Sequence, residues 1–246
     1  MIKDFIVAVL VGMLLTASVA AQEKILLAAE DDWYPYSARI GQQLEGRSVD
    51  IVKAAYAAAG AALTLEAVPF NRGMIRTKEG HYSGVFNAGL NEDVHRDFLI
   101  PRNTIALSEQ VVVARNHEPF QGKSSFNDKR LALTLGYTYP TDITEDRRNK
   151  IERAVGDVNN LKKIAIGRAD FTIIDRLVFL SILAKEPTLK PALAIVGKLE
   201  SDKIYVLFSK NSSGEKALFL FDQGMDKIKR TGTLKKIVDG WESKLR

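Results

Sequence analysis

The residue with the clearest potential for chemistry is Asp175, an acid that directly follows the apolar run 171–174. An amphipathic stretch at 160–166 and a Gly-Arg-Ala-Asp turn at 167–170 precede this run, which predicts a helix, a turn and a short strand. Ligands of open α/β sheets bind outside the carboxyl ends of the strands, so Asp175 would face a cleft. Its carboxylate suits a cationic or hydrogen-bond-donating ligand group. A helix cap or a surface acid is the alternative, and we interpret Asp170 as a structural residue of the turn.

Three arginines could bind a ligand carboxylate, because a guanidinium offers paired N–H donors where a lysine offers only a point charge. They are Arg72, Arg96 and Arg102. Arg72 is the strongest candidate of the three, because the sequence places it at the start of a helix, and this start is expected to face the end of a strand. A solvated surface position is the alternative for each.

Aromatic and polar side chains follow other predicted strands. Trp33 and Tyr36 lie in the first strand–helix loop, where aromatic rings can stack on a ligand, although core packing is the alternative. Tyr137 and Thr138 follow a later predicted strand and precede a predicted helix, a place where backbone amides and a hydroxyl bind anionic oxygens. Asn87 ends a short strand and could supply an amide. A plain turn is the alternative for these last three.

No pattern of catalytic or metal-binding residues is present in the sequence. The three histidines, His81, His95 and His117, lack metal-ligand spacing. The chain also lacks a Gly-x-Ser-x-Gly motif, a phosphate loop and a dinucleotide fingerprint. We therefore expect a binding protein without a cofactor or a metal, rather than an enzyme.

The composition is that of an ordinary globular protein. The 246 residues are 46% hydrophobic and 26% charged, which allows a full core and argues against disorder. The net charge of +5 is spread along the chain, which favours a soluble surface over a nucleic-acid-binding stripe. The absence of cysteine excludes disulfides and thiolate metal sites.

The N-terminus has the features of a secretory signal peptide. A short basic start, an apolar run at 5–15 and small residues at 16–21 predict cleavage after residue 21 and export to a bacterial periplasm. An uncleaved membrane anchor is the alternative.

The rest of the chain alternates between predicted strands and helices, which implies largely parallel sheets covered by helices. Strands are expected at 24–29, 63–68, 85–86, 110–115, 131–135, 194–196 and 203–209, and helices at 49–59, 71–79, 214–231 and 234–245. The strands at 110–115 and 203–209 could be two crossings between lobes. We therefore expect one lobe from 22–112 and 206–246, a second lobe from 113–205, and a ligand site between them.

Five stretches together resemble the family 3 extracellular solute-binding proteins, the amino-acid-binding class that feeds bacterial ABC importers. These stretches are Trp33-Tyr34-Pro35-Tyr36, the segment 45–52, Pro69-Phe70-Asn71-Arg72-Gly73, Gly136-Tyr137-Thr138-Tyr139 and the segment 167–175. The resemblance covers the whole chain after the signal peptide. It implies the type II periplasmic binding protein fold, an α/β fold with two lobes and two crossover hinge strands, closing around a small polar ligand.

The resemblance also implies roles for individual residues. In the family an acid of the second lobe holds the ligand ammonium, and Asp175 matches it. An arginine after the first lobe's switch-point strand pairs with the ligand carboxylate. In this sequence the position of that arginine falls one or two residues before Arg96. A small shift in the alignment would make Arg96 the family arginine, and the alternative is that Arg102 takes its role. The family's Asp-Gly after the second helix is altered here to Tyr82-Ser83-Gly84.

The leading hypothesis is therefore a monomeric periplasmic protein that delivers a small polar solute to an ABC permease in the inner membrane. A ligand-sensing partner of a membrane receptor is the first alternative. The second is a periplasmic dehydratase of cyclic acids, with Asp175 as the acid. The residues leave the ligand open among basic, acidic and neutral compounds.

Overall fold

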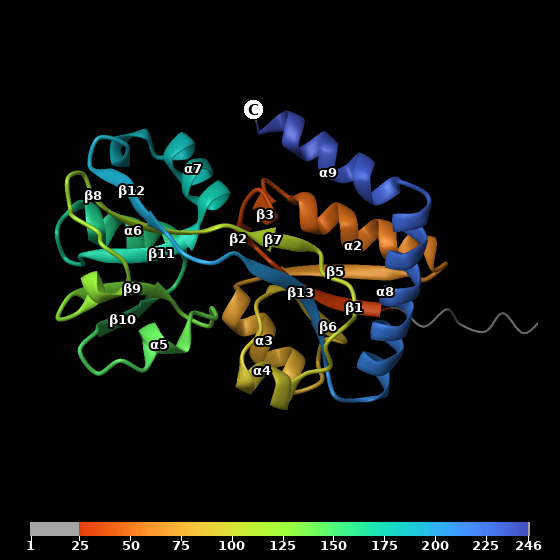
Figure 1. The fold of residues 1–246 in the computed structure, drawn as a ribbon. Coiled ribbons are helices and arrows are strands. Elements are labelled where there is room, and N and C mark those ends of the chain that lie inside the picture. The colour runs from red at the N-terminus through yellow and green to blue at the C-terminus, as the bar shows by residue number, and fades with distance from the viewer. Residues whose placement is uncertain (1–24, 246) are drawn as a thin grey trace, which may run out of the picture.

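Two lobes, each with a five-stranded sheet, make up the computed structural model, which describes residues 25–245 (Figure 1). The first sheet contains β1 (Ile25–Glu30), β5 (Leu63–Val68), β6 (Gly84–Ala88), β7 (Ala106–Ser108) and β13 (Asp202–Phe208), in the order β5-β1-β6-β13-β7. The second contains β8 (Gln110–Arg115), β9 (Arg130–Thr134), β10 (Lys150–Ala154), β11 (Phe171–Asp175) and β12 (Leu193–Lys198), in the order β10-β9-β11-β8-β12. The expected α/β fold with two lobes is confirmed.

Helices cover both faces of the first sheet (Figure 1). One face carries α2 (Arg47–Ala58), α8 (Ser212–Arg230) and α9 (Thr233–Lys244), and the other carries α3 (Phe70–Lys78) and α4 (Glu92–Asp97). Because successive side chains of a strand point to opposite faces, Leu27 packs in the first of these layers and Ala28 in the second.

Helices α2 and α8 approach each other closely at Gly224. A Cβ atom on Gly224 would lie 1.9 Å from the carbonyl oxygen of Ala55, so only glycine fits there.

The second lobe is a sheet of mixed direction with helices around it. Strands β9, β10 and β11 are parallel, whereas β8 pairs antiparallel with both β11 and β12. The helical elements are α5 (Thr141–Thr144), α6 (Asp157–Ala165), α7 (Arg176–Lys185) and the short 3₁₀ turns η2 (Lys123–Phe126) and η3 (Pro187–Leu189). Apolar residues of α6 and α7 pack on one face of the sheet, and Phe126 and Ile143 pack on the other.

A small antiparallel sheet replaces the loop expected after β1. It consists of β2 (Asp32–Trp33), β3 (Ser37–Ile40) and β4 (Gln43–Glu45). The Ser37 hydroxyl donates to the carbonyl of Glu30 (2.5 Å) and ties this sheet to the end of β1.

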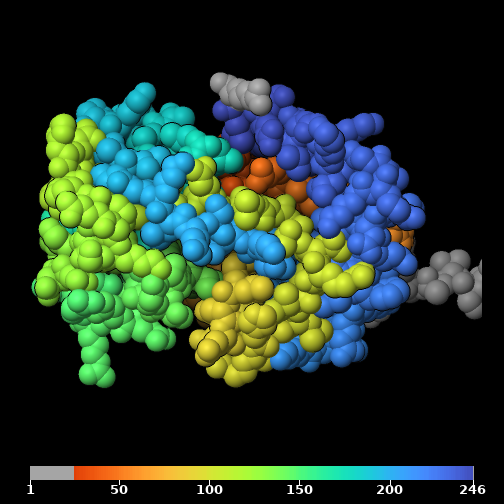
Figure 2. Space-filling model, in the orientation of Figure 1, coloured from red at the N-terminus to blue at the C-terminus, as the bar shows by residue number. Residues whose placement is uncertain are grey.

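The chain crosses between the lobes twice, but at slightly different places from those expected. All of β8 lies in the second sheet and all of β13 in the first. The boundaries expected at 112/113 and 205/206 therefore fall inside strands, since backbone pairing keeps each strand within a single sheet. The crossings lie before Gln110 and between Lys198 and Asp202, and the second lies on the face seen in Figure 2.

The other expected elements agree with the structure to within a few residues, and several short ones are additional. The signal peptide expected at 1–21 lies outside the described residues. Across residues 25–245, no helix combines the length and the apolar character needed to cross a membrane.

Candidate functional site

The carboxyl end of β11 places Asp175 between the lobes, where it is buried and fully hydrogen-bonded. Its Oδ1 accepts from the backbone amides of Leu177 (2.8 Å) and Val178 (3.1 Å), so Asp175 is the N-cap of α7. Its Oδ2 accepts from the hydroxyls of Tyr36 (3.0 Å) and Ser108 (2.8 Å), both in the first lobe. The sequence offered a helix cap and a cleft acid as alternatives for Asp175, and in the structure the residue is both. Burial raises its pKa.

An aromatic cluster lines the space beside Asp175. Trp33 and Tyr36 stack with ring centroids 4.2 Å apart, and both side chains are almost completely buried. Tyr137 of the second lobe meets Trp33 edge-on at 6.5 Å and Phe70 at 5.3 Å. Three of the expected aromatic residues therefore come together, and Phe70 is a fourth that the sequence did not single out as a site residue.

Thr138 also lies where the two lobes meet. A Cβ atom on Gly89 would come within 3.2 Å of the Thr138 hydroxyl, so the loop after β6 approaches the loop after β9 closely. Tyr137 and Thr138 are thus placed at the cleft as expected, with their backbone directly after a turn at Gly136 that has a φ of 86°.

Glu30, at the end of β1, is a cleft acid that the sequence reading missed. It is 4% exposed, and the Tyr137 hydroxyl of the opposite lobe donates to its Oε1. Its Oε2 is buried without a hydrogen-bond partner. Burial raises the pKa of Glu30 well above its ordinary value, although the bond from Tyr137 lowers it. The strand-end argument that identified Asp175 would also have found Glu30.

Asp157 is a second acid that was missed. It begins α6, is 3% exposed, and accepts a hydrogen bond from the Thr134 hydroxyl through Oδ1. Its Oδ2 has no partner, and burial raises the pKa of Asp157 to about 7. A Cβ atom on the preceding Gly156 would lie 3.3 Å from Asp32 Oδ2, so the start of α6 lies close to the chain just after β1. The charge of Asp157 raises the pKa of Glu30.

Asn87 lies close to Glu30 in an uncommon backbone conformation. Its φ is 77°, a left-handed value that asparagine tolerates better than most residues. The side chain is 7% exposed, and neither of its amide atoms has a hydrogen-bond partner of acceptable geometry, although the amide lies near enough to lower the pKa of Glu30.

Two cavities adjoin these residues. The larger, about 560 Å³, lies between the lobes and is lined by Glu30, Phe70, Arg72 and Tyr137, among others. The smaller, about 30 Å³, is lined by Trp33, Phe70, Asn87, Tyr137 and Thr138, among others. Phe70 and Tyr137, whose rings meet edge-on, line both cavities.

The three candidate arginines have different positions. Arg72 is on α3 and lines the larger cavity with an exposed side chain. Arg102 is 75% exposed and forms ion pairs with Asp222 (3.5 Å) and Asp226 (3.1 Å) of α8. It therefore lies away from the aromatic cluster.

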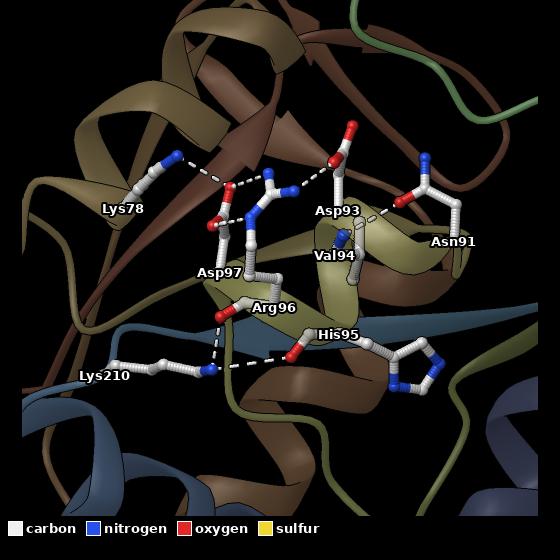
Figure 3. A network of polar contacts seen from close by, with 8 residues as sticks. All are labelled: Lys78, Asn91, Asp93, Val94, His95, Arg96, Asp97 and Lys210. Carbon is white, nitrogen blue, oxygen red and sulfur yellow. Dashed lines mark hydrogen bonds and ion pairs between the residues drawn. The ribbon is translucent and has the colours of Figure 1, made fainter.

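Arg96 belongs to a network of charged residues on the surface of α4 (Figure 3). It pairs with Asp93 (2.6 Å) and Asp97 (3.0 Å), and Lys78 of α3 also pairs with Asp97 (2.7 Å). The arginine is 65% exposed and lines neither cavity. In this structure it does not join the other expected site residues.

Asp170 has the structural place expected for it. Its carboxylate pairs with Arg130 (2.9 Å) and accepts from the Arg130 backbone amide (2.9 Å), which joins the turn before β11 to the start of β9.

Comparison with known proteins agrees with this architecture. Residues 25–244 match the model of the bacterial extracellular solute-binding proteins, family 3. A probable amino-acid-binding protein, YxeM of Bacillus subtilis (strain 168), is 19% identical over 208 residues, which are 83% of this chain and 78% of that protein.

Several solved structures have the same fold. A mutant of ArgBP from T. maritima has a TM-score of 0.76 at 18% identity, covering 89% of this chain and 95% of that one. ArtJ of Geobacillus stearothermophilus, an arginine-, lysine-, histidine-binding protein, has a TM-score of 0.78 at 15% identity, covering 89% and 95%. A histidine kinase sensor domain with similarity to periplasmic binding proteins reaches 0.81 at 16% identity, covering 89% and 96%.

The family model covers nearly all of the described chain, and it describes binding proteins rather than enzymes, as the sequence led us to expect. The type II fold is confirmed by the two-lobed structures that it matches. This protein belongs to the family 3 bacterial extracellular solute-binding proteins.

Proposed function

We propose that this protein captures a small, amino acid-like solute between its lobes and presents it to an ABC permease in the inner membrane. The observation that carries the proposal is the position of Asp175, a buried carboxylate of the second lobe that contacts Tyr36 and Ser108 of the first. A ligand that bridges the lobes at this point would favour the closed form by its additional contacts.

The aromatic cluster and the relatives support the same conclusion. Trp33 and Tyr36 offer ring surface for the apolar or planar part of a solute. YxeM is described as amino-acid-binding, and ArtJ as binding arginine, lysine and histidine. Arg72 is the cleft arginine best placed to contact a ligand carboxylate, because it lines the larger cavity.

A thermal-shift screen over amino acids, amines and small organic acids tests this proposal. A true ligand at a hundred times its dissociation constant adds about 2.7 kcal/mol to the free energy of unfolding. The variant Asp175→Asn keeps the cap of α7 but removes the charge, so it should lose at least tenfold in affinity. A screen without any stabilising solute, or wild-type affinity in Asp175→Asn, would overturn the proposal.

We further propose that the protein is exported through a signal peptide at 1–21, works in the periplasm and is a monomer. The family is described as extracellular, which supports export. Intact mass of the secreted protein should correspond to a chain that begins at Gln22, and light scattering should give the mass of one chain.

A sensing role is the second candidate, and the fold shared with a histidine kinase sensor domain favours it. The two roles differ in the membrane partner. Uptake of the identified solute into vesicles that contain a permease encoded beside this chain would support transport. Ligand-dependent autophosphorylation of a neighbouring kinase, without uptake, would support sensing.

A further inference from the structure

We infer that Lys185 of the second lobe and Tyr34 of the first form a latch that raises the closed population of the protein, and with it the affinity for any solute. Neither residue lines the two cavities described above, so the latch does not touch the solute. Both are thus positioning residues, which act on the solute through closure of the lobes. The part of this inference that concerns affinity rests on the proposed function.

The contact between the two residues crosses from one lobe to the other. Tyr34 lies in the loop between β2 and β3, and Lys185 is the last residue of α7. The Lys185 Nζ atom lies 4.9 Å from the centre of the Tyr34 ring, a distance at which the ring face attracts a cation. A cavity of about 110 Å³ beside them is lined by Asp32 and Tyr34 of the first lobe and by residues of α6 and α7. The two lobes therefore meet here as well as at Asp175.

The first lobe holds the Tyr34 ring in place through its C-terminal helix. The Trp241 ring of α9 meets the Tyr34 ring edge-on, with the ring centroids 6.0 Å apart. The indole N–H of Trp241 donates to Oδ2 of Asp50 on α2 (2.8 Å), and the Trp241 side chain is buried. Figure 1 shows α9 and α7 on the same side of the molecule, one in each lobe. Because the ring is already fixed in the first lobe, little conformational entropy is lost when Lys185 approaches it.

Lys185 is not engaged by an acid of its own lobe. Within residues 25–245 it forms no hydrogen bond or ion pair, and the adjacent Glu186 pairs with Lys162 instead (2.9 Å). Across the lobes it faces Asp32, whose pKa is raised by burial and lowered by the positive charge of Lys185. Separation of the lobes would remove both the ring and this acid from the ammonium group. The contact therefore stabilises the closed form alone and shifts the equilibrium toward it.

The effect on binding follows from the population of the closed form. When a solute binds only closed molecules, its apparent affinity falls in proportion to the fraction of molecules that are closed. Loss of the latch should therefore weaken every solute by the same factor, whereas loss of a residue that contacts the solute weakens some solutes more than others. A cation over the half-buried Tyr34 ring corresponds to a factor on the order of three- to tenfold.

The first experiment measures closure without any solute, by the formation of a disulfide across the lobes. The chain has no cysteine, so the paired substitutions Gly89→Cys and Thr138→Cys introduce the only thiols. A Cβ atom on Gly89 would lie 3.3 Å from the Cβ atom of Thr138, close to the separation that a disulfide requires. At a fixed concentration of oxidised glutathione, the rate of cross-linking follows the closed population.

Three changes at the surface of the second lobe are compared in this reporter protein. Lys185→Met keeps the apolar stem but removes the charge, and it should slow cross-linking by about three- to tenfold. Lys185→Arg keeps a cation that can lie over the ring, so it should cross-link like the unchanged reporter. Lys190→Met removes an exposed cation just beyond α7 that contacts neither lobe's ring, and it should also leave the rate unchanged.

The second experiment measures affinity in proteins without the reporter cysteines. Isothermal titration calorimetry uses arginine, lysine and histidine, together with any other solute that stabilises the protein in the thermal-shift screen. Lys185→Met should weaken all of the solutes that bind by the same factor. Tyr34→Leu should have a similar effect, and the double variant should lose little more than either single variant, because both changes remove one contact.

The outcomes separate the latch from the proposed function. Unchanged cross-linking or unchanged affinity in Lys185→Met overturns the latch and leaves the solute-binding function standing. A loss of affinity that differs among solutes also overturns it, because Lys185 would then contact the solute. If no solute binds the wild type, the proposed function is wrong, and the cross-linking rates alone decide whether the latch exists. Slower cross-linking with an equal loss for every solute supports the inference.

Discussion

Removal of the Asp175 side chain should destabilise the fold as well as impair binding. Asp175→Ala removes four accepted hydrogen bonds, two from the amides of α7 and two from hydroxyls of the other lobe. Loss of the helix cap costs about 1 kcal/mol. The buried hydroxyls of Tyr36 and Ser108 would each lose their acceptor, at about 1–3 kcal/mol apiece. Relief of a buried charge offsets part of this, so we expect a loss of about 3–5 kcal/mol.

Asp175→Asn separates the structural role from the charge. Asparagine caps a helix as well as aspartate does, and its Nδ2 can donate to a hydroxyl oxygen where Oδ2 accepted. This variant should stay within about 1–2 kcal/mol of the wild type.

Urea denaturation followed by tryptophan fluorescence measures these differences, because Trp33 and Trp241 are both buried. Asp239→Ala, which removes an exposed acid paired with Lys235 on α9, is the control and should change stability by less than about 0.5 kcal/mol. Two results would contradict this reasoning. One is a free energy of unfolding of Asp175→Ala within about 1 kcal/mol of the wild-type value, and the other is an equal loss of stability in Asp175→Asn. In either case the hydrogen bonds to Asp175 would not stabilise the fold in the way proposed.

Three further predictions concern other parts of the molecule. Because the pKa of Asp157 is raised to about 7, the folded state binds its proton more tightly than the unfolded chain does. The free energy of unfolding should therefore fall as the pH rises from about 4 to 7, by on the order of 4 kcal/mol from this group, and urea midpoints of Asp157→Asn should show a shallower decline. Gly224→Ala should lower stability by about 1–3 kcal/mol or more, because its Cβ would meet the Ala55 carbonyl, and a wild-type melting temperature would contradict that close approach. Arg96→Ala should change stability by less than about 1 kcal/mol and leave solute affinity unchanged, since its ion pairs are exposed; a tenfold loss of affinity by calorimetry would show that Arg96 reaches the ligand.

The sequence was sufficient for the features that depend on strand ends. The apolar run before Asp175 predicts that this residue lies at the cleft. The position of Trp33 and Tyr36 in the loop after the first strand predicts the same for both aromatic residues. The same reasoning applies to Glu30, but it begins the acidic run 30–32, and such a run is typical of a polar loop.

The position of Arg96 depends on features that periodicity does not reveal. Helix α4 has only six residues, and its rotation is set by its cap, where the Asn91 side chain accepts from the Val94 amide (2.8 Å). This start directs Arg96 toward Asp93 and Asp97 (Figure 3). The lobe boundaries likewise depend on which sheet pairs with β8 and β13, and an apolar strand can pair with either sheet.

The place of β13 in the first sheet has a consequence for the order in which the molecule can be assembled. This strand lies between β6 and β7, and its Tyr205 pairs with Ala88, far back along the polypeptide. Every strand of the second sheet, by contrast, comes from the uninterrupted stretch 110–198. During synthesis on the ribosome, all strands of the second sheet are therefore available before β13, an interior strand of the first sheet, has been made. The first lobe, whose synthesis begins earlier, can thus be completed only after the second lobe has been synthesised and β13 has followed it.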